Sequence, residues 1–245
     1  MSTSRYDFSV PIDVNGVNIG HDASMSTSEK TASRARYHHG DLRNALAVAA
    51  LELAREGGPD AVVLREAARR VGVSATAAYR HFAGQLDLLI EVKYQALGIL
   101  AGTIAEALED CDKDKTGIDP GELAVARLRS AAYAYLRFAF TEQGLFNTAF
   151  CHGDHADSDF PQGNPNYTGV EAFLFLGGLL DDLVATGRMT AQRRPYAEIA
   201  AWTAVHGIAV LFVHGPLRHL PEDARDAAVN CAIEVNIRGL TCEAG

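Results

Sequence analysis

The side chains best suited to contact a large polyanion lie in one stretch, residues 62–82. Its second half begins with small residues and ends in Tyr79, Arg80 and His81. Their hydroxyl, guanidinium and imidazole groups can form hydrogen bonds, and the guanidinium carries a positive charge. What these groups could bind depends on the elements that position them.

Two short helices and a tight turn are predicted to position these donors. Gly72 ends the first helix, because glycine adopts the left-handed C-terminal conformation at little cost. Ser74 stands where its side chain can accept from the free N–H groups of the second helix, residues 75–81. The first helix is indicated by an apolar stripe at helical spacing, made of Leu64, Ala67, Ala68 and Val71.

Two helices joined at a steep angle by a short glycine-containing turn form a helix-turn-helix, whose second helix enters the DNA major groove. An ordinary helical hairpin inside an all-α domain has the same spacing, and the spacing alone leaves both interpretations open. The charge distribution favours the first. Residues 36–83 hold seven arginines against five acidic residues, whereas the whole chain carries a net charge of −9. A basic segment on an acidic body is typical of a molecule that presents one end to a polyanion.

The composition excludes several other classes. The chain has 245 residues, of which 48% are hydrophobic, and can therefore bury a core. The four cysteines are far apart, which argues against a disulfide framework or a structural zinc site. Residues 151–157 combine Cys, His and Asp, but without a second set at matched spacing we expect a polar loop and no metal. Without a secretory signal or an apolar run of about 20 residues, a cytoplasmic location is expected.

The rest of the chain reads as helices separated by polar breaks, with no strand pattern. Residues 1–35 lack periodicity, and we expect a disordered arm. Asp41 is predicted to cap the first helix, which Gly57 ends. The predicted fold is all-α, with a three-helix head (36–84), a long fourth helix as connector (85–109) and a helical body for ligand binding and dimerisation (118–245). Asp119-Pro120 begins the body with a cap and a proline at the first helical position.

From about Asp41 to Lys93 the chain resembles the DNA-binding domain of the TetR family of transcriptional regulators. The body resembles the branch of that family whose C-terminal domain carries a Trp…His-Gly motif, here Trp202, His206 and Gly207. The residues that carry the resemblance of the head are Leu42 through Leu53, Arg65-Glu66 with Ala68, Gly72-Val73-Ser74, Tyr79-Arg80-His81-Phe82 and Leu88-Leu89.

This resemblance implies a homodimer, formed through the last two helices, that places one recognition helix per chain in the major groove of a double-stranded operator. Tyr79 and His81 match positions that contact phosphates, and residues 75–77 match positions that face bases. Two departures remove phosphate contacts that the family often has: Val63 in place of Ser or Thr, and Gln85 in place of Lys. The residues predicted to bind DNA are Arg65, Ser74, Ala75, Thr76, Ala77, Tyr79, Arg80, His81 and Gln85.

The resemblance also implies a small-molecule effector among the body helices, whose binding shifts the long fourth helix and spreads the two heads. Aromatic residues of the body supply an apolar lining. The alternative is that most of them are plain core residues and that His206 pairs with a backbone carbonyl. The predicted ligand-binding residues are Tyr133, Tyr135, Phe138, Phe146, Phe150, Phe173, Trp202 and His206, with Phe175 also in the lining.

The function expected from the sequence is a ligand-responsive DNA-binding repressor that needs no cofactor. An enzyme is not expected, because no nucleophile–base pair, glycine-rich phosphate loop or carboxylate pair stands out. The alternative is a TetR-fold ligand or partner module that has lost specific DNA binding, which Val63, Gln85 and the acidic total would fit.

Overall fold

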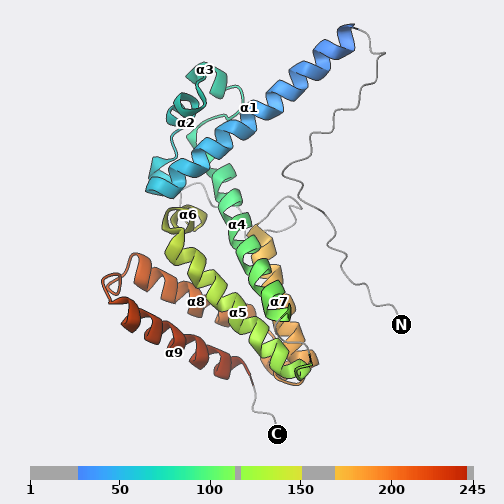
Figure 1. Cartoon of the computed structure of the whole chain (residues 1–245), viewed down its shortest axis with the longest axis vertical. Coiled ribbons are helices and arrows are strands. Elements are labelled where there is room, and N and C mark those ends of the chain that lie inside the picture. Colours follow the sequence, from blue (N-terminus) through green and yellow to red (C-terminus); the bar gives the residue numbers. More distant parts are fainter. Residues whose placement is uncertain (1–26, 114–116, 151–168, 242–245) are drawn as a thin grey trace. The chain divides into compact units, whose positions relative to one another are not determined.

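The computed structural model describes residues 27–113, 117–150 and 169–241, and every regular element within these ranges is helical (Figure 1). The all-α prediction is therefore confirmed. The chain divides into two units, residues 1–40 and residues 41–245. The elements described below belong to the second unit, apart from the first part of α1.

Helix α1 runs from Thr27 to Gly57, so the prediction that Asp41 begins it is wrong. Residues 27–39 include Ala, Lys, Arg and Glu, which propagate a helix well even without apolar periodicity. The expected disordered arm is therefore wrong for residues 27–35, and its remainder lies outside the described residues. The predicted end of the helix is confirmed, because Gly58 has φ 69° and a short 3-10 turn, η1 (Pro59–Ala61), follows.

The helix-turn-helix forms with the predicted cap residues. Helix α2 (Leu64–Val71) ends at Gly72, which has φ 78°. The Ser74 side chain accepts from the Ala77 N–H at 3.2 Å. Helix α3, however, covers only Ala75–Ala78, whereas the sequence predicted a helix to residue 81. Residues 79–81 form a tighter turn, because the N–H groups of Arg80 and His81 donate three residues back rather than four.

Helix α4 (Gln85–Lys113) connects the head to the body, and it packs against α5, α6 and α7 (Figure 1). It extends four residues past the predicted end at 109, because Cys111 is still buried against the body. Among the described residues it is the one helix whose length and mean hydropathy would suit a membrane crossing, which is weak evidence for a helix that packs in the core.

The body consists of α5 (Pro120–Thr141), α6 (Gln143–Ala149), α7 (Gly169–Ala185), η2 (Ala191–Arg193), α8 (Ala197–Val213) and α9 (Glu222–Leu240). The predicted start of α5 is confirmed, since the Asp119 carboxylate accepts from the Gly121 and Glu122 N–H groups. Helix α8 packs on α5, α7 and α9.

The sequence misjudged which residues α7 and α8 bury. The spacing of apolar residues in α7 predicts a buried stripe that includes Leu174, but Leu174 is 65% exposed, while Leu179, Leu180 and Leu183 are buried. On α8 the same spacing predicts that Ile199 and Val210 are buried, but both are exposed. Both helices are apolar on nearly every face, so the spacing of apolar residues does not identify the buried one.

Candidate DNA interface and ligand site

The polar residues predicted to contact DNA lie on the exposed side of α2, α3 and the turn that follows. Arg65, Thr76 and Arg80 are exposed, and Tyr79 is 48% exposed. Beneath them Ala78 and Phe82 are fully buried. The head thus presents a short helix of small residues flanked by donors, and a major groove is wide enough to admit a helix.

Most arginines of the head are neutralised by carboxylates. Arg69 and Arg70 both pair with Glu66, at 2.7 and 3.4 Å, and Arg70 also pairs with Glu56 at 2.6 Å. The Arg69 guanidinium, and after it that of Arg70, lower the pKa of Glu66 to about 2. These pairs therefore persist at neutral pH.

Two exposed arginines of the head have no such partner within the described parts of the chain: Arg65 and Arg80. They belong to α2 and to the turn after α3, so the free positive charge of the helix-turn-helix lies beside the recognition helix. Both were predicted as DNA-binding residues. Their availability supports that prediction.

A second set of predicted residues gathers in the body around His206 of α8. The rings of Phe150, Trp202 and Phe146 lie 4.8, 5.5 and 5.6 Å from the imidazole, centroid to centroid. Phe173 of α7 meets Trp202 edge-on at 6.4 Å. Together with Tyr135 these rings form what we term the aromatic cluster: Tyr135, Phe146, Phe150, Phe173, Trp202 and His206.

The Tyr135 hydroxyl organises the polar atoms of the aromatic cluster. It accepts from the Trp202 Nε1–H at 3.4 Å and lies 2.8 Å from Nδ1 of His206. Burial raises the pKa of the Tyr135 phenol, which keeps it protonated and able to donate to Nδ1. Nδ1 is the acceptor where the hydroxyl donates, and the donor in the other tautomer of His206. His206 thus has a side-chain partner, and its expected pairing with a backbone carbonyl stays a prediction.

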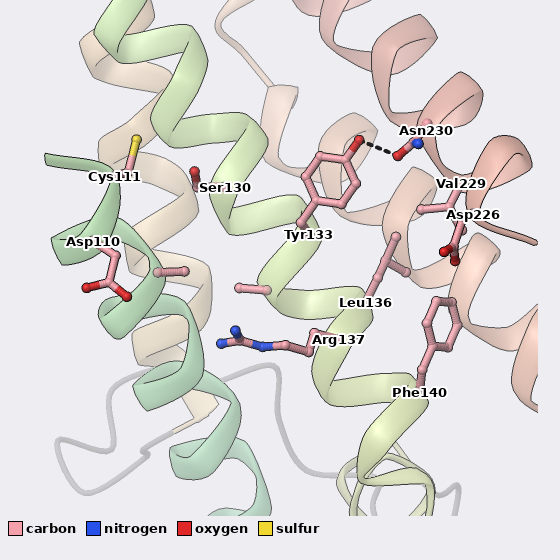
Figure 2. A pocket seen from close by; sticks show the side chains of 12 residues that line it. Asp110, Cys111, Ser130, Tyr133, Leu136, Arg137, Phe140, Asp226, Val229 and Asn230 are labelled. Carbon is pink, nitrogen blue, oxygen red and sulfur yellow. Dashed lines mark hydrogen bonds between the residues drawn. The ribbon is translucent and has the colours of Figure 1, made fainter. Parts of the chain in front are cut away.

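Two predicted ligand residues lie elsewhere. Phe138 is buried in the core. Tyr133 faces the opposite way, donating to Asn230 of α9 at 2.6 Å, and lines an open groove of about 670 Å³ along α5 between α4 and α9 (Figure 2). The polar groups along the groove have mixed charge, with Arg137, Asp110 and Asp226 all present. Sequence spacing placed Tyr133 and Tyr135 together, but residues two apart on a helix point to opposite sides.

One face of α8 and α9 has no partner within the described chain. Val235 is 63% exposed, and Ile199 is 45% exposed. Small residues separate the apolar ones: Ala200, Thr203 and Gly207 on α8, and Ala228 and Cys231 on α9. A Cβ at Gly207 would meet nothing within 4 Å, so the face is open at that point. This face lies on the last two helices, through which the resemblance implies a homodimer.

Residues 151–157, weighed above as metal-ligand types, lie outside the described residues. In the ranges that the structure describes, no group of three or more His, Cys, Asp or Glu side chains could hold a metal ion.

Comparison with known proteins identifies the family. Residues 46–92 match the sequence model described as bacterial regulatory proteins of the tetR family. Residues 128–235 match the model described as a tetracyclin repressor-like C-terminal domain, and the two together span more than half of the chain. The chain belongs to the TetR family.

Solved structures agree with this assignment. A protein of unknown function from Rhodococcus sp. RHA1 is 25% identical, with a TM-score of 0.64 over 84% of this chain and 98% of its own. A structure assigned to the tetR family of transcription regulators, from Shewanella sp. PV-4, is 16% identical, with a TM-score of 0.53 over 82% of this chain and 98% of its own. At that identity the likeness shows the fold alone. No curated protein matches the chain at a significant level.

In this TetR family chain, the packing of α6 against the end of α1 was not predicted from the sequence. A Cβ at Gly144 would lie 2.1 Å from the carbonyl oxygen of Ala54 and 2.5 Å from that of Arg55, so the backbone of α6 rests directly on the end of α1. Glu142 pairs with Arg55 at 3.2 Å beside this contact. Phe146, two residues along α6, belongs to the aromatic cluster. The only sequence signal was a glycine before an apolar segment.

Proposed function

We propose that this TetR family protein is a ligand-responsive transcriptional repressor that binds a near-palindromic operator as a homodimer and is released by a small molecule. The observation that carries the proposal is the helix-turn-helix with its free charge confined to Arg65 and Arg80 beside the recognition helix. Because four other arginines of the head already have carboxylate partners, the field is directed to the groove-reading side.

On DNA, Tyr79 and His81 form hydrogen bonds to phosphates and fix the register of the protein on the duplex. Ser74 and Gln85, at the starts of α3 and α4, also contact the DNA. Residues 75–77 face the bases. Their methyl groups suit contact with thymine, and the Thr76 hydroxyl pairs with several bases. Since this face offers few polar groups, groove shape contributes to sequence preference.

The homodimer forms through the exposed face of α8 and α9. Val235 and Ile199 would each otherwise remain in water, and a two-fold axis pairs the face with its own copy. Gly207, Thr203 and Ala200 leave the space that close helix packing requires. The proposed body, residues 118–245, thus combines dimerisation with effector binding.

The effector binds at the aromatic cluster. All six side chains are aromatic or imidazole, which suits a flat, largely apolar molecule. Tyr135, Trp202 and His206 supply the polar atoms. Trp202, His206 and Gly207 support placement in the branch with the Trp…His-Gly motif. The proposed setting is the cytoplasm, where the operator is, and the proposed activity is not enzymatic.

Binding to the DNA upstream of the protein's own gene tests this function. We expect salt-sensitive retardation of that fragment, since phosphate neutralisation releases counterions. Tyr79→Ala should abolish it while the melting temperature stays unchanged, because this side chain is 48% exposed. Failure of the wild type to bind this fragment, or any fragment selected from the source genome, would refute it.

The second candidate is a TetR-fold ligand module without specific DNA binding. Val63 caps α2 without a side-chain hydrogen bond, where the family often has Ser or Thr. Footprinting separates the two: a repressor protects one short segment, whereas the module protects none.

A further inference from the structure

The turn that carries Tyr79 and His81 is not held by its own helix. Helix α3 has only four residues, and a helix that short has little stability of its own. In the turn that follows, the N–H groups of Arg80 and His81 donate to carbonyls three residues earlier, at 3.2 and 2.9 Å. Its orientation must therefore come from contacts with other elements.

Arg43 of α1 supplies three such contacts with one side chain. Its guanidinium carbon lies 4.2 Å from the centroid of the Phe82 ring. Its Nη1 donates to the backbone carbonyl of His81, and its Nη2 donates to the Glu91 carboxylate of α4 at 3.1 Å. Gln95 in turn donates to the other oxygen of Glu91 at 3.2 Å, which holds that carboxylate in place.

The three contacts depend on the shape of arginine. A planar guanidinium can stack on a ring while its edge donates to two acceptors, whereas a lysine ammonium is a single point charge. Phe82 is fully buried, so its ring is a fixed platform. The carbonyl that Arg43 holds belongs to His81, and fixing it also fixes the direction of the neighbouring side chains.

We propose that Arg43 is a positioning residue for DNA binding, which holds the turn of Tyr79–His81 against α1 and α4 without contacting the duplex itself. The proposal rests on the function proposed above. Glu91 belongs to the same device. Removing a negative charge near a DNA-binding surface normally strengthens DNA binding. Removing the Glu91 carboxylate should weaken it instead, because Arg43 would lose a partner that holds it in place.

The test compares the full-length chain with Arg43→Lys, Glu91→Ala and, as a reference for a direct contact, Arg80→Gln, on the fragment upstream of its own gene. Arg43→Lys keeps the charge and should bind about tenfold more weakly, equivalent to about 1.4 kcal/mol. Glu91→Ala should also bind more weakly, although electrostatics alone predicts tighter binding. Both should keep the wild-type salt dependence, whereas Arg80→Gln should lower the salt slope by about 1.

Wild-type affinity in Arg43→Lys would overturn the proposal, as would tighter binding by Glu91→Ala. Hydrogen exchange of the backbone amides of residues 79–82 separates this outcome from a failure of the proposed function. If the wild type binds no DNA, the proposed function falls. Faster exchange of these amides in Arg43→Lys would still show that Arg43 holds the turn, and unchanged exchange would refute that as well.

Discussion

The sharpest structural prediction concerns Gly144, where α6 rests on the end of α1. An added Cβ would lie 2.1 and 2.5 Å from the carbonyl oxygens of Ala54 and Arg55, and 2.8 Å from the Arg55 carbonyl carbon. These are backbone atoms, so no side chain can rotate away. Either α6 or the end of α1 has to move.

The expected cost of Gly144→Ala follows from two opposing terms. Overpacking of a closely fitted contact typically costs about 1–3 kcal/mol. Replacing glycine by alanine inside a helix returns roughly 0.5–1 kcal/mol. The cost of overpacking should exceed the gain in helix propensity, because the Cβ would lie more than 1 Å closer to the Ala54 carbonyl oxygen than in an ordinary contact. We therefore expect a net loss of about 1–2 kcal/mol in the free energy of unfolding, or a fall of about 2–8 °C in melting temperature for a chain of this size.

Gly102→Ala is the matched control. Gly102 lies in the interior of α4, and a Cβ there would meet nothing within 4 Å. This substitution should raise the melting temperature by roughly 1–4 °C, because only the helix-propensity term remains. Thermal unfolding followed by circular dichroism measures both variants. If Gly144→Ala proves as stable as Gly102→Ala, the close contact between α6 and α1 does not exist as described, and the reasoning fails.

Two further predictions concern the dimer face and the charge network of the head. Val235→Glu should weaken a homodimer at least about a hundredfold, because two carboxylates would meet across the two-fold axis. The control is Val48→Glu on α1, at a comparably exposed valine, which should leave the dimer intact. Light scattering after size-exclusion chromatography measures the oligomeric state of both variants. Glu66 has its pKa lowered to about 2 by Arg69 first and then Arg70, so its ion pairs stabilise the fold above the unfolded pKa of 4.5 and are lost as the pH falls toward 2. The melting temperature of the wild type should therefore fall relative to that of Glu66→Gln between pH 5 and pH 2, because protonation removes the stabilising effect of a carboxylate whose pKa is lowered. A constant difference between the two melting temperatures would refute this prediction.

Local signals in the sequence predicted the helix-turn-helix well. Gly72 adopts the left-handed conformation, and Ser74 and Asp119 cap their helices as predicted. Each of these depends on one residue type and its immediate neighbours. The same reasoning failed at Asp41, because a good cap residue does not prevent a helix from continuing when the preceding residues also favour one.

Predictions that needed the third dimension succeeded only in part. The aromatic cluster brings together six of the eight predicted ligand residues, from α5, α6, α7 and α8, but Tyr133 lies on another face and Phe138 in the core. No spacing rule pairs Arg43 with His81 or Gly144 with Ala54, since these contacts join elements that are far apart in sequence. The buried faces of α7 and α8 were misjudged for a different reason: apolar residues surround both helices, so their pattern carries little directional information.

The two proposed sites meet at α6, a helix of seven residues. Gly144 and Phe146 lie about 200° apart around its axis, so one faces α1 and the other faces the aromatic cluster. A helix of this length has little stability of its own, so its position depends on the elements that it packs against, the end of α1 and the aromatic cluster. The Glu142–Arg55 pair adds only a modest term, because both side chains are about one-third exposed. The position of α6 is therefore set mainly by packing, on the head through Gly144 and on the aromatic cluster through Phe146.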